Sequence, residues 1–233
     1  MPAGARVRPR LAESLRVATR PLHAEVERAG VMAALIRGQC GLATYCALLR
    51  NLHALYAALE SALTAHAADP RIARVCFPEL WREAAITADL RVLHGERWAQ
   101  DIGLVPSTVT YVERLRRLGQ EQPAGLVAHA YVRYLGDLSG GQTLRRMLAQ
   151  VLQRDDGYGL QFYEYPRIRD ARAFADRFRA ALNAVELDEQ STARVIDEAR
   201  FGFQLHAAMF RELADVADRP AAAEPEPVQL RPV

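Results

Sequence analysis

The segment 126–151 has the apolar spacing of an α-helix but carries three glycines in its interior. Its apolar residues recur every three or four positions, at Leu126, Val127, Tyr131, Tyr134, Leu135, Leu138, Leu144, Met147, Leu148 and Val151. Each interior glycine destabilises a helix by about 1 kcal/mol relative to alanine. Gly136 and Gly140 are one turn apart and share a face, and Gly141 follows directly. That face therefore presents bare backbone to whatever lies against it.

Two explanations account for the bare face. Glycines allow two helices to pack closely, and the run Ser139, Gly140, Gly141 is also common in ordinary loops. Alternatively, a ligand approaches the backbone at Gly136 and Gly140, with Asp137 and Ser139 beside it. The residues of this segment alone are compatible with both.

The rest of the chain is also helical in its periodicity, and no segment of the sequence shows sustained strand alternation. We predict helices at residues 11–29, 31–37, 42–67, 79–93, 107–118, 123–154, 170–185 and 188–217. Gly30 is expected to end the first helix, because glycine is favoured just after a helix C-terminus. Pro78 is expected to start the fourth helix, Ser107 to cap the fifth, and Pro123 to open the glycine-containing one.

Composition narrows the class of protein. We predict one all-α domain over residues 11–217, between disordered segments at 1–10 and 218–233. The net charge of only +2 disfavours nucleic-acid binding, and all 30 basic residues are arginine. No apolar run of about 18 residues exists, and the N-terminus lacks the apolar region of a secretory signal. Three cysteines without metal-binding spacing indicate free thiols. We therefore expect a cytoplasmic protein without a membrane anchor.

Histidines are the first candidates for metal chemistry. The chain has six, His23, His53, His66, His94, His129 and His206. A single helical histidine is more often solvated or hydrogen-bonded than bound to metal, and we apply that interpretation to the second, third and fourth. His23 differs because Leu22 and Val26 place it near an apolar stripe, where an imidazole needs a partner. Iron is a suitable partner, and Glu27, one turn later, can orient the ring through water.

Three segments together resemble the heme oxygenase family. Residues 129–142, which include the run GDLSGGQ, resemble the family's kinked distal helix, whose glycine backbone contacts heme. Residues 15–27 resemble the proximal helix, with His23 at the position of the axial iron ligand. Residues 51–60 resemble a third family segment. Because the three occur in the family's order and spacing, the resemblance extends from about Leu11 to Leu213.

The resemblance implies a set of heme contacts. His23 ligates iron and Glu27 supports it, while Gly136 and Gly140 form the distal wall. Ser139, Gly141 and Phe203 are implied as further residues of the heme site.

The resemblance also implies a distal proton-delivery network. In it, Asp137 orders water, and Tyr56 and Arg133 join the same network. The residues alone allow a simpler explanation, in which Arg133 and Asp137 form an i,i+4 salt bridge on a solvated helix face.

Heme propionates need cations at the mouth of the site. Arg16 lies two turns before His23, and the resemblance implies that Tyr131 and Arg179 contribute as well. The chain departs from the mammalian pattern one turn before Arg179, where Ala175 replaces an expected basic residue. This substitution is expected to affect the orientation of the heme within its own plane.

As a function, the resemblance implies oxidative cleavage of heme b, which is both cofactor and substrate, to biliverdin, carbon monoxide and ferrous iron. Electrons come from an external reductant, such as ferredoxin, flavodoxin or a reductase, and we expect a monomer. The alternative is a heme-binding protein without turnover, used for storage, transfer or sensing. Another alternative, a helical enzyme acting on a different small molecule, has no need of His23 together with the glycine run.

Overall fold

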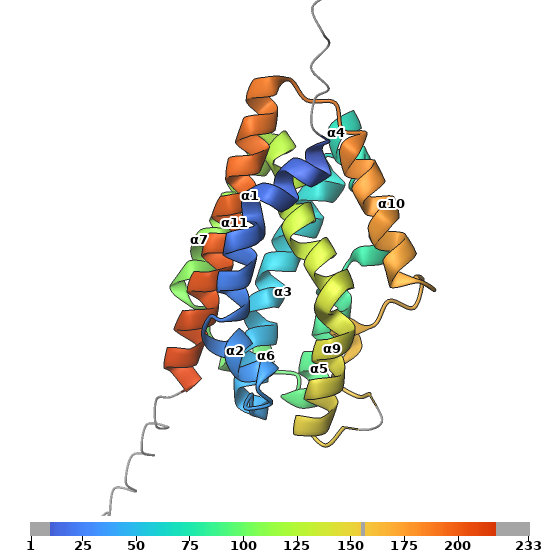
Figure 1. The fold of residues 1–233 in the computed structure, drawn as a ribbon. Helices are drawn as coiled ribbons and strands as arrows, with labels where there is room; N and C mark the ends of the chain where they lie inside the picture. The colour runs from blue at the N-terminus through green and yellow to red at the C-terminus, as the bar shows by residue number, and fades with distance from the viewer. Residues whose placement is uncertain (1–9, 155–156, 218–233) are drawn as a thin grey trace, which may run out of the picture.

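The computed structural model describes residues 10–154 and 157–217, and over those residues it contains only helices and their connections (Figure 1). The longer α-helices are α1 (Leu11–Glu27), α3 (Leu42–Ala65), α5 (Glu83–Leu93), α7 (Pro106–Glu121), α9 (Gly136–Val151), α10 (Ala171–Asn183) and α11 (Glu189–Ala217). The shorter elements are α2 (Gly30–Ile36), α4 (Pro70–Ala73), η1 (Pro78–Leu80), α6 (Trp98–Asp101), η2 (Pro123–Gly125), α8 (Leu126–Ala130), η3 (Tyr131–Leu135) and η4 (Gln161–Tyr163). The predicted all-α class is confirmed.

Helix α3 forms the centre of the bundle. It packs against α5, α7, α8 and α11. Its buried leucines recur at helical spacing, at Leu48, Leu49, Leu52, Leu55, Leu59 and Leu63. Burying an apolar side chain of this size stabilises the fold by about 1.5–3 kcal/mol. The packing of α3 therefore provides a rigid base for the elements in front of it.

Helices α1 and α9 lie in front of α3 in the view of Figure 1. Helix α10 contacts both of them, and so does α2. Together, α2 and α10 hold α1 and α9 apart as two walls. The cleft described in the next subsection lies between these walls.

Gly30 has a different role from the predicted one. Helix α1 ends at Glu27, and Gly30 is the first residue of α2, with φ of +37°. A Cβ atom at Gly30 would lie 1.9 Å from the carbonyl oxygen of Phe210 on α11. The prediction that Gly30 ends the first helix was wrong, because the close approach of α11, and not a local cap, requires glycine here.

Two other predicted helix starts also differ from the structure. Pro78 begins the short 3₁₀ turn η1, and the α-helix α5 starts only at Glu83. Helix α7 starts at Pro106, so Ser107 lies inside its first turn. The N–H and hydroxyl of Ser107 both donate to Glu212 Oε2 on α11, at 2.9 and 2.8 Å. Ser107 is not a local cap, because a carboxylate distant in sequence takes its hydrogen bonds.

The glycine-containing segment is not one continuous α-helix. It consists of η2, α8, the π-helical turn η3 and α9 in succession. The irregular turn covers Tyr131–Leu135 and ends just before Gly136, whereas Gly136, Gly140 and Gly141 all lie within the α-helix α9. A π-turn widens the helix locally and often marks a functional site. The interruption of the α-helix therefore precedes the glycines.

The predicted disordered ends fall almost entirely on residues 1–9 and 218–233, which lie outside the described residues. Within residues 10–154 and 157–217, no helix is both long and apolar enough to cross a membrane.

Candidate functional site

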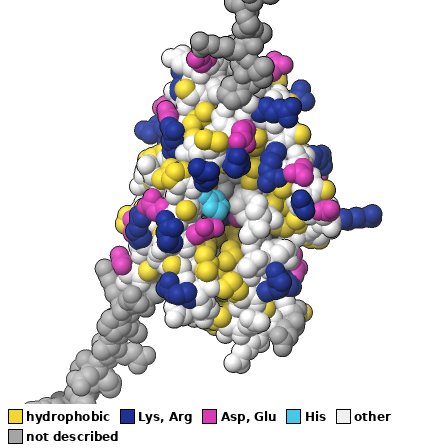
Figure 2. Space-filling model, viewed as in Figure 1, with side chains coloured by type: hydrophobic (Ala, Val, Ile, Leu, Met, Phe, Trp, Pro, Cys, Tyr) yellow, Lys and Arg dark blue, Asp and Glu magenta, His cyan; other side chains and the backbone are white. Residues whose placement is uncertain are grey.

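A cleft separates α1 from α9. It consists of two adjoining cavities of about 490 and 450 Å³. Both are lined by His23, Val132, Gly136, Ser139 and Phe203. Figure 2 shows this face of the molecule, with a histidine in the hollow, arginines around it and hydrophobic side chains below it. The shared lining joins a polar mouth to an apolar interior.

His23 belongs to the α1 wall. Its side chain is 53% exposed, and its Nδ1 atom lies 3.5 Å from Glu27 Oε1, one turn along the same helix. The ring of Phe203, on α11, lies 5.9 Å from the imidazole, centroid to centroid. Because Nδ1 faces the carboxylate, Nε2 is the ring nitrogen available to a ligand.

The bare glycine face belongs to the α9 wall. A Cβ atom added at Gly136 or Gly140 would meet nothing within 4 Å outside its own helix. Close helix packing does not explain these two glycines, because no other helix of residues 10–154 and 157–217 lies against them. Gly141 lines the same cleft but is buried, and a Cβ there would lie 3.5 Å from Cδ1 of Tyr163. The open space before Gly136 and Gly140 is the cleft itself.

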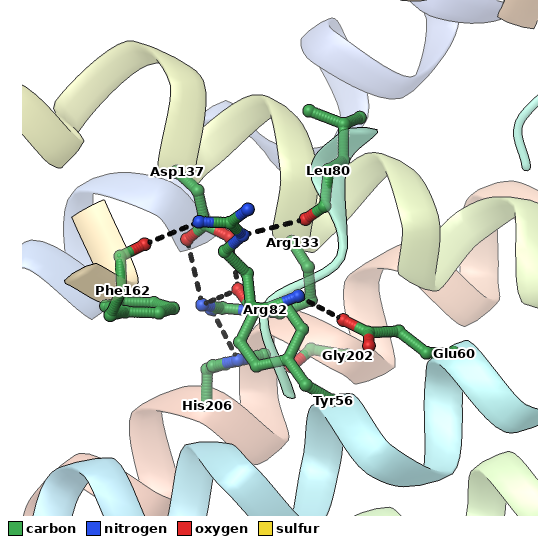
Figure 3. A network of polar contacts seen from close by, with 9 residues as sticks. All are labelled: Tyr56, Glu60, Leu80, Arg82, Arg133, Asp137, Phe162, Gly202 and His206. Carbon is green, nitrogen blue, oxygen red and sulfur yellow. Dashed lines mark hydrogen bonds and ion pairs between the residues drawn. The ribbon is translucent and has the colours of Figure 1, made fainter. Parts of the chain in front are cut away.

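A network of hydrogen bonds lies beside the glycine face (Figure 3). The Tyr56 hydroxyl, on α3, donates to Asp137 Oδ2. Arg133 donates from Nε and Nη2 to the Tyr56 oxygen, at 3.0 and 2.6 Å, and from Nη2 to Asp137 Oδ1, at 3.0 Å. Both oxygens of the Asp137 carboxylate are therefore held in place.

The environment of this network is almost dry. The side chains of Arg133 and Asp137 are only 11% and 12% exposed. The i,i+4 pair suggested by their spacing exists, but it is buried and not on a solvated face. Burial raises the pKa of Asp137, although the charge of Arg133 and the hydrogen bond from Tyr56 oppose that shift. Burial likewise raises the pKa of the Tyr56 hydroxyl, which stays protonated and remains a donor.

His206, on α11, completes the network, and the sequence analysis did not select it. Its Nε2 atom lies 2.8 Å from Arg133 Nη1, and its Nδ1 atom lies 2.9 Å from the carbonyl oxygen of Gly202. The reasoning applied to His23, that an imidazole on an apolar helix face needs a partner, selects His206 equally well, since it lies among Phe203, Met209 and Phe210. The apolar residues around His206 are therefore a signal in the sequence for this residue.

A second buried cluster lies behind His206. Tyr111 Oη is 2.9 Å from His129 Nδ1, and His129 Nε2 is 2.9 Å from Glu198 Oε1. Arg114 donates to both oxygens of Glu198. Burial would raise the pKa of Glu198, but its hydrogen bonds from Arg114 and His129 outweigh burial and hold the pKa at about 2. This cluster anchors α11 to α7 and α8.

The mouth of the cleft carries the three predicted propionate contacts. Arg16, Arg179 and Tyr131 all line the larger cavity. Arg16 pairs with Glu13 and Arg179 with Asp176, each at 2.7 Å. These exposed pairs are weak and can open for an anion.

Two residues near the mouth do not contribute a cation. Ala175 is buried in the core at the position where the family resemblance leads one to expect a basic residue. Arg177 does not replace it, because its guanidinium lies over the rings of Phe77 and Phe174, and neither cavity includes it.

The chain matches the family model described as heme oxygenase over residues 9–212. It is 35% identical over 203 residues to heme oxygenase 1 of Nostoc sp., covering 87% of this chain and 85% of that protein.

Solved structures are similar over the same region. Heme oxygenase-1 of the cyanobacterium Synechocystis sp., in complex with heme, superimposes with a TM-score of 0.85 at 34% identity, covering 89% of this chain and 93% of that one. Heme oxygenase of Leptospira interrogans gives a TM-score of 0.83 at 33% identity, covering 87% and 98%.

Proposed function

Because the chain belongs to the heme oxygenase family, we propose that it cleaves heme oxidatively to biliverdin and releases carbon monoxide and ferrous iron. The observation that carries this proposal is the pairing of two unlike walls across one cleft. One wall offers an imidazole, His23, and the other offers bare backbone at Gly136 and Gly140 beside a buried carboxylate, Asp137.

The residues of the cleft fit heme. A flat, apolar ring with two carboxylates needs apolar walls, one axial ligand and cations at one edge. Leu48, Leu144 and Phe210 are among the apolar residues of the inner cavity, and Arg16 and Arg179 stand at its mouth. We assign iron ligation to His23 Nε2, with Glu27 orienting the ring. Tyr131 adds a hydroxyl at the mouth, which lies 3.1 Å from Thr19 Oγ1.

Bound heme supplies the iron that activates dioxygen and the ring that is oxidised. The side chains of the cleft orient the heme and supply protons to the site. Asp137 is held by Tyr56 and Arg133 with its carboxylate at the cleft wall, where we assign it the ordering of water. A carboxyl group whose pKa is raised by burial can hold a proton and release it within the site.

We propose that the bare glycine face leaves open space on the distal side of the bound heme. A side chain at Gly136 or Gly140 would project into the cleft, where the structure has open space. Ser139 and Phe203, which line both cavities, and Gly141, which lines the inner one, are proposed as contacts of the ring.

The alternative, a heme binder without turnover, needs the ligand and the apolar walls but not the Asp137 network. Burying a carboxylate and a guanidinium is costly unless each has hydrogen-bonding partners. Here two residues distant in sequence, Tyr56 and His206, provide three such contacts. This provision supports catalysis over storage, transfer or sensing.

We further propose that electrons come from an external protein such as a ferredoxin, a flavodoxin or a reductase, and that the enzyme is a cytoplasmic monomer. Its three cysteines are free thiols, two of them buried, as is usual in a reducing compartment.

The test is direct. Purified protein, loaded with one equivalent of heme and supplied with reductant and air, should convert the heme spectrum to that of biliverdin, with carbon monoxide trapped by myoglobin. Stable heme binding without ring opening, under several reductants, would favour the binding protein. Absence of heme binding would refute both functions.

A further inference from the structure

We propose that His206 is a positioning residue for this reaction, because its imidazole accepts a hydrogen bond from Arg133 and so holds the guanidinium that orients Asp137. The proposal rests on the proposed function and adds to it a residue on α11.

The geometry fixes the protonation state of His206. A guanidinium has only donors, so the 2.8 Å contact between Arg133 Nη1 and His206 Nε2 requires that Nε2 accept. The carbonyl of Gly202 has only acceptors, so the 2.9 Å contact at Nδ1 requires that Nδ1 carry the proton. The neutral tautomer protonated at Nδ1 satisfies both contacts. The imidazolium also carries a proton on Nε2, which would face the N–H donor of Arg133.

The surroundings keep the ring in that state and orientation. His206 is 1% exposed. The Tyr111 ring meets it edge-on at a centroid distance of 5.1 Å. The charged or titratable groups that face it are Arg133 on η3, His129 on α8 and Tyr111 on α7. Burial, followed by the charge of Arg133, lowers the pKa of His206 well below its usual value.

Gly202 also helps to position His206. It lies one turn before His206 on α11, and its carbonyl receives the Nδ1 proton. A Cβ atom at Gly202 would lie 3.1 Å from Tyr111 Oη and 3.2 Å from His129 Nδ1. The missing side chain therefore lets α11 approach α7 and α8 closely enough for His206 to reach Arg133.

The consequence concerns Arg133. With His206 as an acceptor, all three guanidinium nitrogens of Arg133 are engaged, by Tyr56, Asp137 and His206 (Figure 3). Without that acceptor, a buried N–H on Nη1 loses its hydrogen-bonding partner, which is unfavourable in the absence of water. The guanidinium would then turn toward another acceptor, and Asp137 would lose the orientation that the cleft needs.

The experiment compares three substitutions at one position. His206→Leu and His206→Met remove the strong acceptor while keeping apolar bulk. The variant whose melting temperature is closer to that of the wild type is used as the acceptor-free variant. His206→Gln keeps a carbonyl oxygen near the place of Nε2. Three quantities are measured for each variant: heme affinity, the kcat for biliverdin formation, and the ¹⁵N-resolved Arg133 Nε–H signal of the apoprotein.

The expected result is a specific pattern. The acceptor-free variant should bind heme as the wild type does, lose about tenfold or more in kcat and show a shifted or broadened Arg133 signal. His206→Gln should restore both kcat and signal. The proposal is overturned if the acceptor-free variant keeps a wild-type kcat and signal, or if His206→Gln is as impaired as that variant although its Arg133 signal is normal.

A failure of the proposed function would look different. The wild type itself would then bind heme without making biliverdin, whereas the Arg133 signal of the apoprotein would still report whether His206 holds the guanidinium. The NMR readout requires neither heme nor turnover.

Discussion

The two walls of the cleft are built by different means. On the α1 side, His23 is half exposed, and its polar partner Glu27 is four residues away. On the α9 side, Asp137 and Arg133 are almost buried, and their partners Tyr56 and His206 are 73 to 81 residues away in sequence. One wall depends on local spacing, and the other depends on the packing of α3 and α11 against η3 and α9.

This difference determines how each wall tolerates change. An exposed i,i+4 contact is worth a few tenths of a kcal/mol, so its loss barely affects folding. A buried charged pair that loses a partner is destabilised by about 3–5 kcal/mol, because the remaining charge stays unsolvated. We therefore expect substitutions on the proximal wall to affect binding of heme, and substitutions in the buried charged network of the distal wall to affect chemistry and folding together.

The largest effect is expected at the proximal wall. His23→Ala removes the imidazole proposed to bind iron, so turnover should be abolished and the heme spectrum should change, while the apoprotein melts normally. Absorption and magnetic circular dichroism measure the change of ligand. His94→Ala, which alters a histidine outside the cleft, is the control and should have no effect. Wild-type spectra and activity in His23→Ala would refute the assignment.

The second effect tests the chemical role of the distal wall. Asp137→Ala should still bind heme through His23 but should lose about 10²-fold or more of its biliverdin formation, since no carboxylate remains to order water and transfer protons. Single-turnover spectra measure it. The control is Asp197→Ala, a surface carboxylate that pairs with Arg200. A normal biliverdin yield from Asp137→Ala would show that Tyr56 and Arg133 suffice.

The third effect separates steric from structural roles on the distal wall. Gly140→Leu should leave the apoprotein melting temperature nearly unchanged, because the new side chain enters open space. Dioxygen binding and ring opening should be impaired, because the same side chain crowds the cleft. Gly103→Leu, at another open glycine outside the cleft, is the control. A loss of about 1–3 kcal/mol in stability with normal turnover would instead indicate a packing role.

The smallest effects concern two carboxylates behind the distal wall that respond to pH in opposite directions. Glu198, held by Arg114 and His129, has a pKa of about 2. Glu60 accepts hydrogen bonds mainly from backbone N–H groups, and burial raises its pKa to about 7. The ionised form of Glu198 therefore stabilises the fold above pH about 4.5, and this stabilisation is lost as the pH falls toward 2. For Glu60, the stabilisation is present below pH about 4.5 and is lost as the pH rises through about 7.

Substitution should therefore flatten different parts of the stability curve. Glu198→Gln should reduce the free energy of unfolding at neutral pH by about 3 kcal/mol and make it less dependent on pH in the acid range. Glu60→Gln should remove the decline between pH about 4.5 and 7. Urea unfolding at several pH values measures both. The same pH dependence in both variants would show that the partners of the two carboxylates do not determine their contributions.

The spacing of residues along the sequence was enough to predict the all-α class and several residues of the cleft. Helical periodicity predicted the all-α class, because each helix buries an apolar stripe whose period is independent of its neighbours. The same reasoning, together with the family resemblance, selected His23, the glycine face and the pair Arg133 and Asp137. Each of these features involves residues only a few turns apart in the sequence, so it is visible there as a spacing of three, four or seven residues.

Tertiary contacts decided the rest. Gly30 allows α11 to pack closely, Ser107 donates hydrogen bonds to Glu212, and His206 accepts one from Arg133 across the bundle. The π-turn η3 interrupts the α-helical segment just before Gly136, whereas the glycines lie within the α-helix α9. Each of these depends on a partner 73 or more residues away or on the packing of several helices at once, and a periodic pattern carries no record of which helices will meet.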